Sequence, residues 1–226
     1  MDIKNIVFDN GGVLSVPSTG HWFITPNFFN IVNNKIDIES LKNAMKKYQN
    51  LLTMEPKTEL EEYEMFSKFY YKVLEEVGYE NPNKDLANKL AEDCVYNNEK
   101  YTFFDEVNKT LGILKQKYNL YIISDAWPSS IRLFNELKLS RFFKDICISS
   151  MESTIKLERL FEVFLKNNIE VKPKQTIFID DRIDILEKAN SLGFNVLLMD
   201  RENRNKKAKY KVINDLNEII NIANKF

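Results

Sequence analysis

The chain has 226 residues, which is enough for one sizeable hydrophobic core with an inserted subdomain but too few for two unrelated domains of full size. Its 32 Lys and Arg residues almost balance its 33 Asp and Glu residues. This balance argues against a nucleic acid or an anionic membrane surface as a partner. We therefore expect a small-molecule role and, by default, a monomer.

The two cysteines give no sign of a disulfide or a metal site. Cys94 and Cys147 are far apart in the sequence and fit no metal-binding or redox spacing, so we expect buried, reduced thiols. The N-terminal apolar run is too short for a signal peptide, and no window approaches the length of a membrane span. These features predict a cytoplasmic protein.

The first predicted element is a buried strand, the apolar run IVF that begins at Ile6. No convincing strand follows for about a hundred residues, and the patterns in this interval are helical. We predict three helices here, over residues 37–52, 58–78 and 83–98. The second helix opens with a capping box formed by Thr58 and Glu61. Its apolar stripe consists of Leu60, Tyr63, Phe66, Tyr70 and Val73.

This helical interval, rich in Tyr and Phe, predicts a cap over the strand ends. The alternative is that the helices simply extend the main core. With a cap, residues 1–15 and 99–226 form the catalytic core and residues 16–98 form the cap.

The second half of the chain alternates between strand and helix patterns. Predicted strands are LYIIS at 120, ICIS at 146, TIFID at 176, NVLLMD at 195 and KVI at 211. Intervening helices show apolar stripes, first Val107, Leu111 and Leu114, then Ile131, Phe134 and Leu137. This alternation predicts an α/β fold with a Rossmann-like parallel sheet and helices on both faces.

Polar residues gather where the predicted strands end. They are Asp9 after the first strand, Ser124 and Asp125 after the second, Ser149, Ser150 and then Lys156 after the third, and Asp180 and Asp181 after the fourth. Each one alone has a structural explanation as a turn residue, a helix cap or a solvated surface group. In an open parallel sheet, however, ligands bind beyond the carboxyl ends of the strands. Their coincidence at one edge therefore indicates a site.

The residue types at this edge suit phosphoryl transfer. Adjacent carboxylates repel one another and need a cation, and oxygen ligands without His or Cys favour Mg²⁺. Asp9 can then form a transient aspartyl phosphate, while Ser124 and Lys156 stabilise the transferring oxygens.

Four stretches of the chain resemble the four motifs of the haloacid dehalogenase superfamily. IVFDNGGVL resembles the nucleophile motif, LYIISDA the Ser/Thr motif, SSMESTIKLERLF the lysine motif and IFIDDRIDILEKANSLG the acidic motif. The similarity covers nearly the whole chain, because the motif order, the cap insertion and the final NVLLMD strand also fit. The chain resembles a phosphatase-like member with a helical cap after the first motif.

The resemblance implies a role for each matching residue. Asp9 would be the nucleophile and a metal ligand. The backbone carbonyl of Gly11 and the acids Asp180 and Asp181 would complete the Mg²⁺ site, with Asp181 as the more direct ligand. The phosphoryl group would be held by Ser124, and the phosphate-binding loops would include Asn10 and Asp125. Lys156 would orient Asp9 and offset its charge.

Two positions depart from the family pattern. Phosphatases of the family usually carry an aspartate, the general acid and base, where this chain has Gly11. A positioned general acid is worth about 10²- to 10⁴-fold in rate, so we expect hydrolysis of esters with good leaving groups and slow turnover of alkyl phosphates. The lysine motif usually continues with Pro-Asp-Pro, whereas here it reads KLERLF, so Lys144 and Lys166 are weaker alternatives to Lys156.

Three aromatic residues are further candidates for the pocket. His21, the only histidine, could replace the missing acid, but a packed or exposed histidine is the favoured interpretation. Trp22 and Trp127 could frame the pocket or pack in the core.

The sequence thus predicts a Mg²⁺-dependent phosphatase for a small phosphorylated metabolite. Alternatives are a metal-independent dehalogenase, a phosphomutase, and a catalytically weak relative that binds a phosphorylated ligand or a protein partner.

Overall fold

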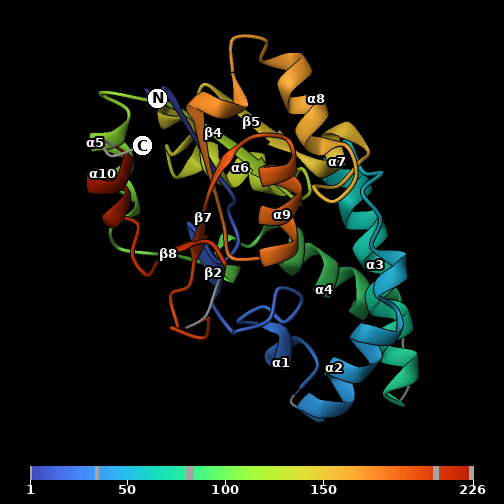
Figure 1. Ribbon diagram of the computed structural model, residues 1–226. Coiled ribbons are helices and arrows are strands. Elements are labelled where there is room, and N and C mark those ends of the chain that lie inside the picture. Colours follow the sequence, from blue (N-terminus) through green and yellow to red (C-terminus); the bar gives the residue numbers. More distant parts are fainter. Residues whose placement is uncertain (1, 34–35, 80–83, 206–208, 224–226) are drawn as a thin grey trace.

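The computed structural model describes residues 2–33, 36–79, 84–205 and 209–223. Its centre is a six-stranded sheet with the order β5-β4-β1-β6-β7-β8, in which every neighbouring pair is parallel (Figure 1). The strands are β1 Asn5–Phe8, β4 Asn119–Ser124, β5 Asp145–Ile148, β6 Thr176–Asp180, β7 Asn195–Met199 and β8 Lys211–Ile213. All six predicted strands and the predicted α/β class are confirmed.

Helices cover both faces of this sheet. They are α5 Val107–Leu114, α6 Ser129–Glu136, α7 Ser149–Glu152, α8 Leu160–Asn167, α9 Ile183–Ser191 and α10 Glu218–Ile222. One hydrophobic cluster joins α5 and α10 to strand residues such as Ile6 and Phe8, and another joins α8 and α9 to Val7. Side chains of a strand alternate between the two faces, so burial on both faces explains why the strands are apolar throughout.

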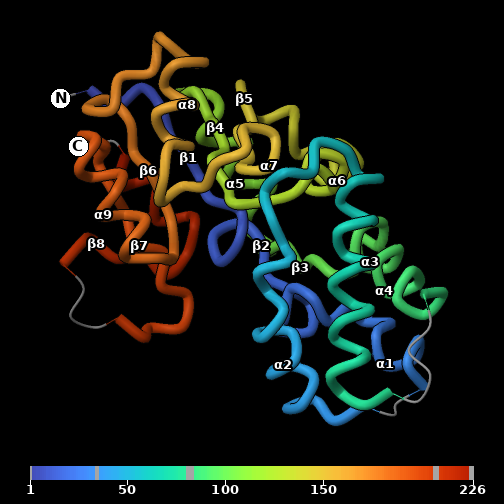
Figure 2. The backbone as a smooth tube through the Cα atoms, turned by 90° about the vertical axis from the view of Figure 1, so that its right-hand side faces the viewer, coloured from blue at the N-terminus to red at the C-terminus, as the bar shows by residue number. Residues whose placement is uncertain are grey.

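Four more helices form the inserted cap beside the sheet. They are α1 Phe28–Ile31, α2 Ile38–Lys47, α3 Glu59–Glu76 and α4 Lys84–Tyr96 (Figure 2). These helices share a third hydrophobic cluster, in which α3 and α4 pack against each other. The third predicted helix began at Asn83, which lies outside the described residues.

A short ribbon marks the passage between the sheet and the cap. Strand β2, Ser15–Pro17, pairs antiparallel with β3, Tyr101–Phe103. Three residues per strand are too few for a sequence pattern, and the ribbon was not predicted. The proposed boundaries after residues 15 and 98 lie close to these two strands and stay a prediction.

Two predicted helix stripes were partly wrong. On α3, Leu60 is 61% exposed, and the buried position of that turn belongs to Glu62, which is 0% exposed. On α6, Leu137 is 45% exposed, whereas Leu133 and Phe134 are buried. Leu60 lies on another side of α3 than Glu62, and Leu137 follows the last residue of α6, so apolar character at the right spacing did not show which positions are covered.

Cys94 and Cys147 are both buried and unpaired, as expected. Among the described residues, no helix combines the length and the apolar character that a membrane span requires.

Glu62 links the cap to the core through a buried carboxylate. Its Oε2 accepts a hydrogen bond from the backbone N–H of Ser129 at 2.8 Å, and its Oε1 accepts one from the Ser129 hydroxyl at 2.7 Å. Ser129 begins α6, where backbone N–H groups lack partners within the helix. The Glu62 side chain from α3 therefore caps a helix of the core.

The Glu62 carboxyl makes stability depend on pH. Burial raises its pKa above the usual 4.5, against the opposing effects of Lys100 and Ser129. A raised folded-state pKa means that the folded chain binds this proton more tightly than the unfolded chain, so the contribution to stability falls as pH rises from about 4.5 through the folded pKa. We expect the difference in free energy of unfolding between wild type and Glu62→Gln to shrink over that window. Chemical denaturation at several pH values measures it, and a pH-independent difference would contradict this assignment.

Candidate active site

The site lies at the carboxyl ends of the central strands. Asp9 follows β1 directly, between β4 and β6 in the sheet, and its backbone N–H donates to the carbonyl of Ile179 at 2.9 Å. The register of β1 and β6 continues to Asp9 and Asp180, which therefore lie side by side. Both side chains are buried, with exposures of 6% and 0%.

Lys156 joins these two carboxylates. Its Nζ lies 2.6 Å from Asp180 Oδ2 and 3.0 Å from Asp9 Oδ1. The contact with Asp180 is a hydrogen bond, whereas Asp9 Oδ1 has only the ionic contact and no hydrogen-bond partner among the described residues. Burial alone would lower the pKa of Lys156, but the surrounding charges of Asp9, Asp180 and Asp125 outweigh it, so the pKa is raised and the side chain is charged.

Asp181 completes a cluster of three carboxylates. Asp9, Asp180 and Asp181 each place one oxygen within 4.8 Å of the others, and Asp181 is the exposed member. Burial raises the pKa of Asp180, with repulsion from Asp9 adding to the effect and Lys156 opposing it. Partial burial of the Asp181 carboxyl raises its pKa to about 6, and repulsion from the charge of Asp9 contributes. Among the described residues, the three carboxylates thus have one ammonium beside them, and the cluster has a net negative charge when all three are ionised.

Asp180 is already bonded on both oxygens. Its Oδ2 accepts from Lys156, and its Oδ1 accepts from the backbone N–H of Arg182 at 2.9 Å. Arg182 is the N-cap residue of α9. The two acids of the pair therefore differ, because Asp180 is held in place while Asp181 remains open to solvent.

The Ser/Thr motif supplies the next group of residues. Ser124 ends β4 and is buried, with 4% exposure. The Asp125 carboxylate accepts a hydrogen bond from the backbone N–H of Lys156 at 2.9 Å, so it positions the lysine motif. Ser149 Oγ accepts from the backbone N–H of Ala126 at 2.9 Å, which fixes the loop after Asp125. Sequence reasoning gave Asp125 a phosphate-binding role but did not foresee its contact with Lys156.

The loop after Asp9 has a fixed shape. The Asn10 carbonyl accepts hydrogen bonds from backbone N–H groups of residues 13–15, and the Asn10 side chain accepts one from the Ser15 hydroxyl at 3.0 Å. Gly12 has φ +73°, and a Cβ there would lie 2.3 Å from Asp181 Oδ2. Only glycine satisfies both the conformation and the space at position 12, so this residue lets the loop lie against the acidic pair.

The three aromatic candidates occupy different places. The Nδ1 of His21 accepts a hydrogen bond from the backbone N–H of Phe23 at 3.2 Å, and burial together with the charge of Lys42 lowers its pKa. These contacts hold the imidazole within the cap segment. Trp127 packs on Phe66 of the cap, and its Nε1 donates to the Thr53 carbonyl at 2.8 Å.

Trp22 alone lies next to the nucleophile loop. Its ring carbon Cζ2 is 3.2 Å from the point where a Cβ on Gly11 would stand. Periodicity could not have shown this contact, because the Trp22 segment is irregular.

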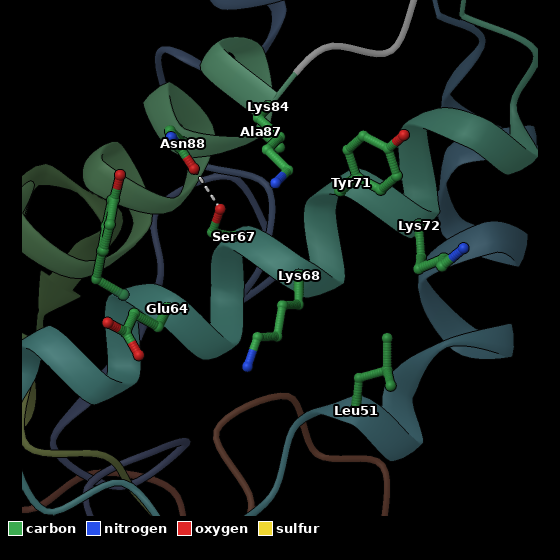
Figure 3. Close-up of a pocket in the computed structure, with 10 residues that line it drawn as sticks. Leu51, Glu64, Ser67, Lys68, Tyr71, Lys72, Lys84, Ala87 and Asn88 are labelled. Carbon is green, nitrogen blue, oxygen red and sulfur yellow. Dashed lines mark hydrogen bonds between the residues drawn. The ribbon is translucent and has the colours of Figure 1, made fainter.

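A separate cavity of about 540 Å³ opens on the cap, across α3 and the start of α4 (Figure 3). It is lined by residues such as Tyr63, Lys68, Tyr71 and Asn88, and Ser67 donates a hydrogen bond to Asn88 at its wall. None of the strand-end residues lines it. Its size therefore says nothing about the chemistry at Asp9.

Solved structures share this arrangement of sheet and cap. The HAD-hydrolase YfnB from Bacillus subtilis, bound to magnesium, superposes with a TM-score of 0.72 at 16% identity, covering 99% of this chain and 100% of the other. The chain has the haloacid dehalogenase fold. The L-2-haloacid dehalogenase from Xanthobacter autotrophicus gives a TM-score of 0.67 at 14% identity, covering 97% and 98%.

A third structure with the haloacid dehalogenase fold is the HAD phosphatase from Thermococcus onnurineus. It gives a TM-score of 0.64 at 17% identity, covering 97% of each chain. Neither a scan against protein-family models nor a search of curated proteins finds a significant match. The fold expected from the four motifs is therefore confirmed, and the neighbours with this fold include both phosphatases and dehalogenases.

Proposed function

We propose that the chain is a Mg²⁺-dependent phosphatase that hydrolyses a small phosphate ester through an aspartyl phosphate on Asp9. One observation carries the proposal: Lys156 contacts both Asp9 and Asp180, and among the described residues it is the one ammonium paired with the three-carboxylate cluster. Such a cluster is two positive charges short of neutrality. A divalent cation fills this deficit, and the neutralised site can then accept an anionic phosphoryl group.

The donor set fits Mg²⁺ in particular. Three carboxylates supply hard oxygen ligands, and Asp9 Oδ1 is buried without a hydrogen-bond partner among the described residues. Asp9 and Asp181 would hold the ion directly with the Gly11 carbonyl, whereas Asp180 would hold Lys156. When bound, Mg²⁺ supplies Lewis-acid stabilisation of negative charge on the phosphoryl oxygens.

The chain's own residues would divide the remaining work. The Lys156 ammonium holds Asp9 in position and offsets its charge, so a carboxylate oxygen of Asp9 can attack phosphorus. The Ser124 hydroxyl donates to a phosphoryl oxygen. The backbone N–H groups of Asn10 and Asp125 stand on the two loops that flank Asp9, where they can donate to the other oxygens.

Removal of metal tests the proposal. We expect hydrolysis of p-nitrophenyl phosphate to stop in EDTA and to return when Mg²⁺ is added in excess, because the carboxylate cluster repels the substrate without the cation. Phosphate release at pH 7 measures this. Full activity in EDTA would contradict the proposed role of the metal.

A dehalogenase is the second candidate, and Gly11 is the observation that favours it. Displacement of halide from carbon by Asp9 needs no proton donor, and the site has no side chain at position 11. The clustered Asp180 and Asp181 oppose this candidate, since that reaction needs no metal. Halide release from a 2-haloacid in EDTA would reverse the ranking.

A further inference from the structure

The Trp22 side chain is unexplained by packing. It is 36% exposed, and among the described residues it belongs to none of the three hydrophobic clusters. Its ring stands at a centroid distance of 5.7 Å from that of Tyr101 of β3. Its exposed part lies beside the nucleophile loop, where a ligand bound at Asp9 can contact it.

Trp22 occupies the space in front of Gly11. A Cβ at position 11 would lie 3.2 Å from Trp22 Cζ2, 3.9 Å from Cη2 and 4.0 Å from Cε2. Alanine would require the indole to shift by a few tenths of an ångström. Aspartate carries the same Cβ and three further heavy atoms, so it requires at least the same shift.

Neither side of this contact can easily move. The Asn10 carbonyl fixes the loop through residues 13–15, and the Asp181 carboxylate lies against Gly12. On the other side, the Thr19 hydroxyl donates to the Ile24 carbonyl, and Ile24 N–H donates to the His21 carbonyl, which folds the Trp22 segment on itself. The backbones that carry Trp22 and Gly11 are therefore both held by hydrogen bonds.

We propose that Trp22 forms the wall for the leaving group and selects phosphate monoesters of flat, aryl-type alcohols. This inference rests on the proposed function. The exposed indole stands against the loop that follows Asp9, so the alcohol part of an ester whose phosphate is bound at Asp9 can lie against its ring. An aromatic face there attracts a flat ring by stacking. The same indole leaves no room for an acid that would protonate an alkoxide.

The hydrolysis of an aryl phosphate can proceed without a proton donor from the protein. An Asp9 oxygen bonds to phosphorus while the ester P–O bond breaks, and the aryloxide leaves as an anion and takes its proton from solvent. Water then bonds to the same phosphorus as the Asp9–phosphorus bond breaks, and its protons stay on the released phosphate. An aryloxide is a stable anion, whereas an alkoxide needs a proton as it departs.

A comparison of binding constants tests the proposed role of Trp22 independently of turnover. In the Asp9→Asn background with Mg²⁺, we expect phenyl phosphate to bind about 2- to 10-fold more tightly than ethyl phosphate, the range of one aromatic contact. Trp22→Ala should abolish this ratio, and Trp22→Phe, which keeps a ring, should retain most of it. Calorimetric titration gives both constants. An unchanged ratio in Trp22→Ala would overturn the inference.

A pair of variants tests the occupied space. Gly11→Asp alone should give no gain in ethyl phosphate hydrolysis, because Trp22 blocks the carboxyl. Gly11→Asp combined with Trp22→Gly should exceed Trp22→Gly alone by about 10²-fold or more, the lower range for a general acid. Circular dichroism confirms that each variant is folded, and Gly11→Ala controls for the added Cβ. An equal gain in the single Gly11→Asp variant would overturn the inference.

The two proposals fail in different ways. If wild type hydrolyses no phosphate ester but the Trp22-dependent binding ratio holds, the phosphatase proposal fails and the aromatic subsite stands. If wild type hydrolyses phenyl phosphate but Trp22→Ala leaves the ratio of phenyl phosphate to ethyl phosphate binding unchanged, only the proposal of the aromatic subsite fails.

Discussion

Replacing Asp9 by Asn should lower the turnover of p-nitrophenyl phosphate by about 10⁴-fold or more, since the loss of a covalent nucleophile removes the reaction path itself. An amide oxygen is a poor nucleophile toward phosphorus and cannot form the acyl phosphate that a carboxylate forms. The measurement is the release of p-nitrophenol at saturating substrate and Mg²⁺. A residual rate within tenfold of wild type would show that Asp9 is not the attacking group.

The fold should survive this substitution. Asp9 repels Asp180 and Asp181, and it is one of the reasons why both of their pKa values are raised. Lys156 keeps its 2.6 Å contact with Asp180 when Asp9 loses its charge. We therefore expect the melting temperature of Asp9→Asn to be similar to that of wild type or higher. Asp85 is an exposed acid of α4, so Asp85→Asn serves as the matched control for activity.

Beryllofluoride adds a measurement that does not depend on turnover. This phosphoryl mimic binds an aspartate carboxylate, so wild type with Mg²⁺ should form a stable complex and Asp9→Asn should not. Absence of any complex in wild type would favour a binding protein over an enzyme.

The sequence predicted the sheet and the place of the site for physical reasons. A parallel sheet buried on both faces leaves continuous apolar runs such as TIFID, and these mark strands without ambiguity when turns and helices flank them. Polar residues that end such runs must gather at one edge. The meeting of Asp9 with Asp180 and Lys156 follows from this rule, although the departure KLERLF had left the choice of lysine less certain.

The contacts across the cap could not be predicted in the same way. Glu62 has the spacing of a buried residue but the chemistry of a surface one, and only its partner at Ser129 explains its burial. Trp22 lies in an irregular segment, so no period relates it to Gly11. Both contacts join residues that are far apart in sequence or irregular in conformation, and a single sequence holds no signal for either.

Replacing Lys156 by Met should destabilise the chain by about 3–5 kcal/mol in EDTA, because it leaves Asp9 and Asp180 buried without a counter-charge. Methionine keeps most of the apolar stem, so the loss reports the charge and not a cavity. For a chain of this length the expected fall in melting temperature is about 6–20 °C.

Lys188 provides the matched control for that substitution. It pairs with Glu162 at 2.7 Å, but both side chains are partly exposed, with 25% and 43% of their surfaces accessible. Solvent screens such a pair, so Lys188→Met should cost only about 0–1 kcal/mol. Chemical denaturation of both variants gives the comparison, and similar losses would show that Lys156 is no more than another ion pair.

Added Mg²⁺ should separate the charge deficit from any packing defect. A divalent cation on Asp9 and Asp181 would return positive charge to the cluster, so the Lys156→Met variant should gain more stability from Mg²⁺ than wild type does. Lys188→Met should gain only as much as wild type. An equal gain in all three proteins would mean that the cation and Lys156 do not act on the same carboxylates, and the shared site around Asp9 would have to be abandoned.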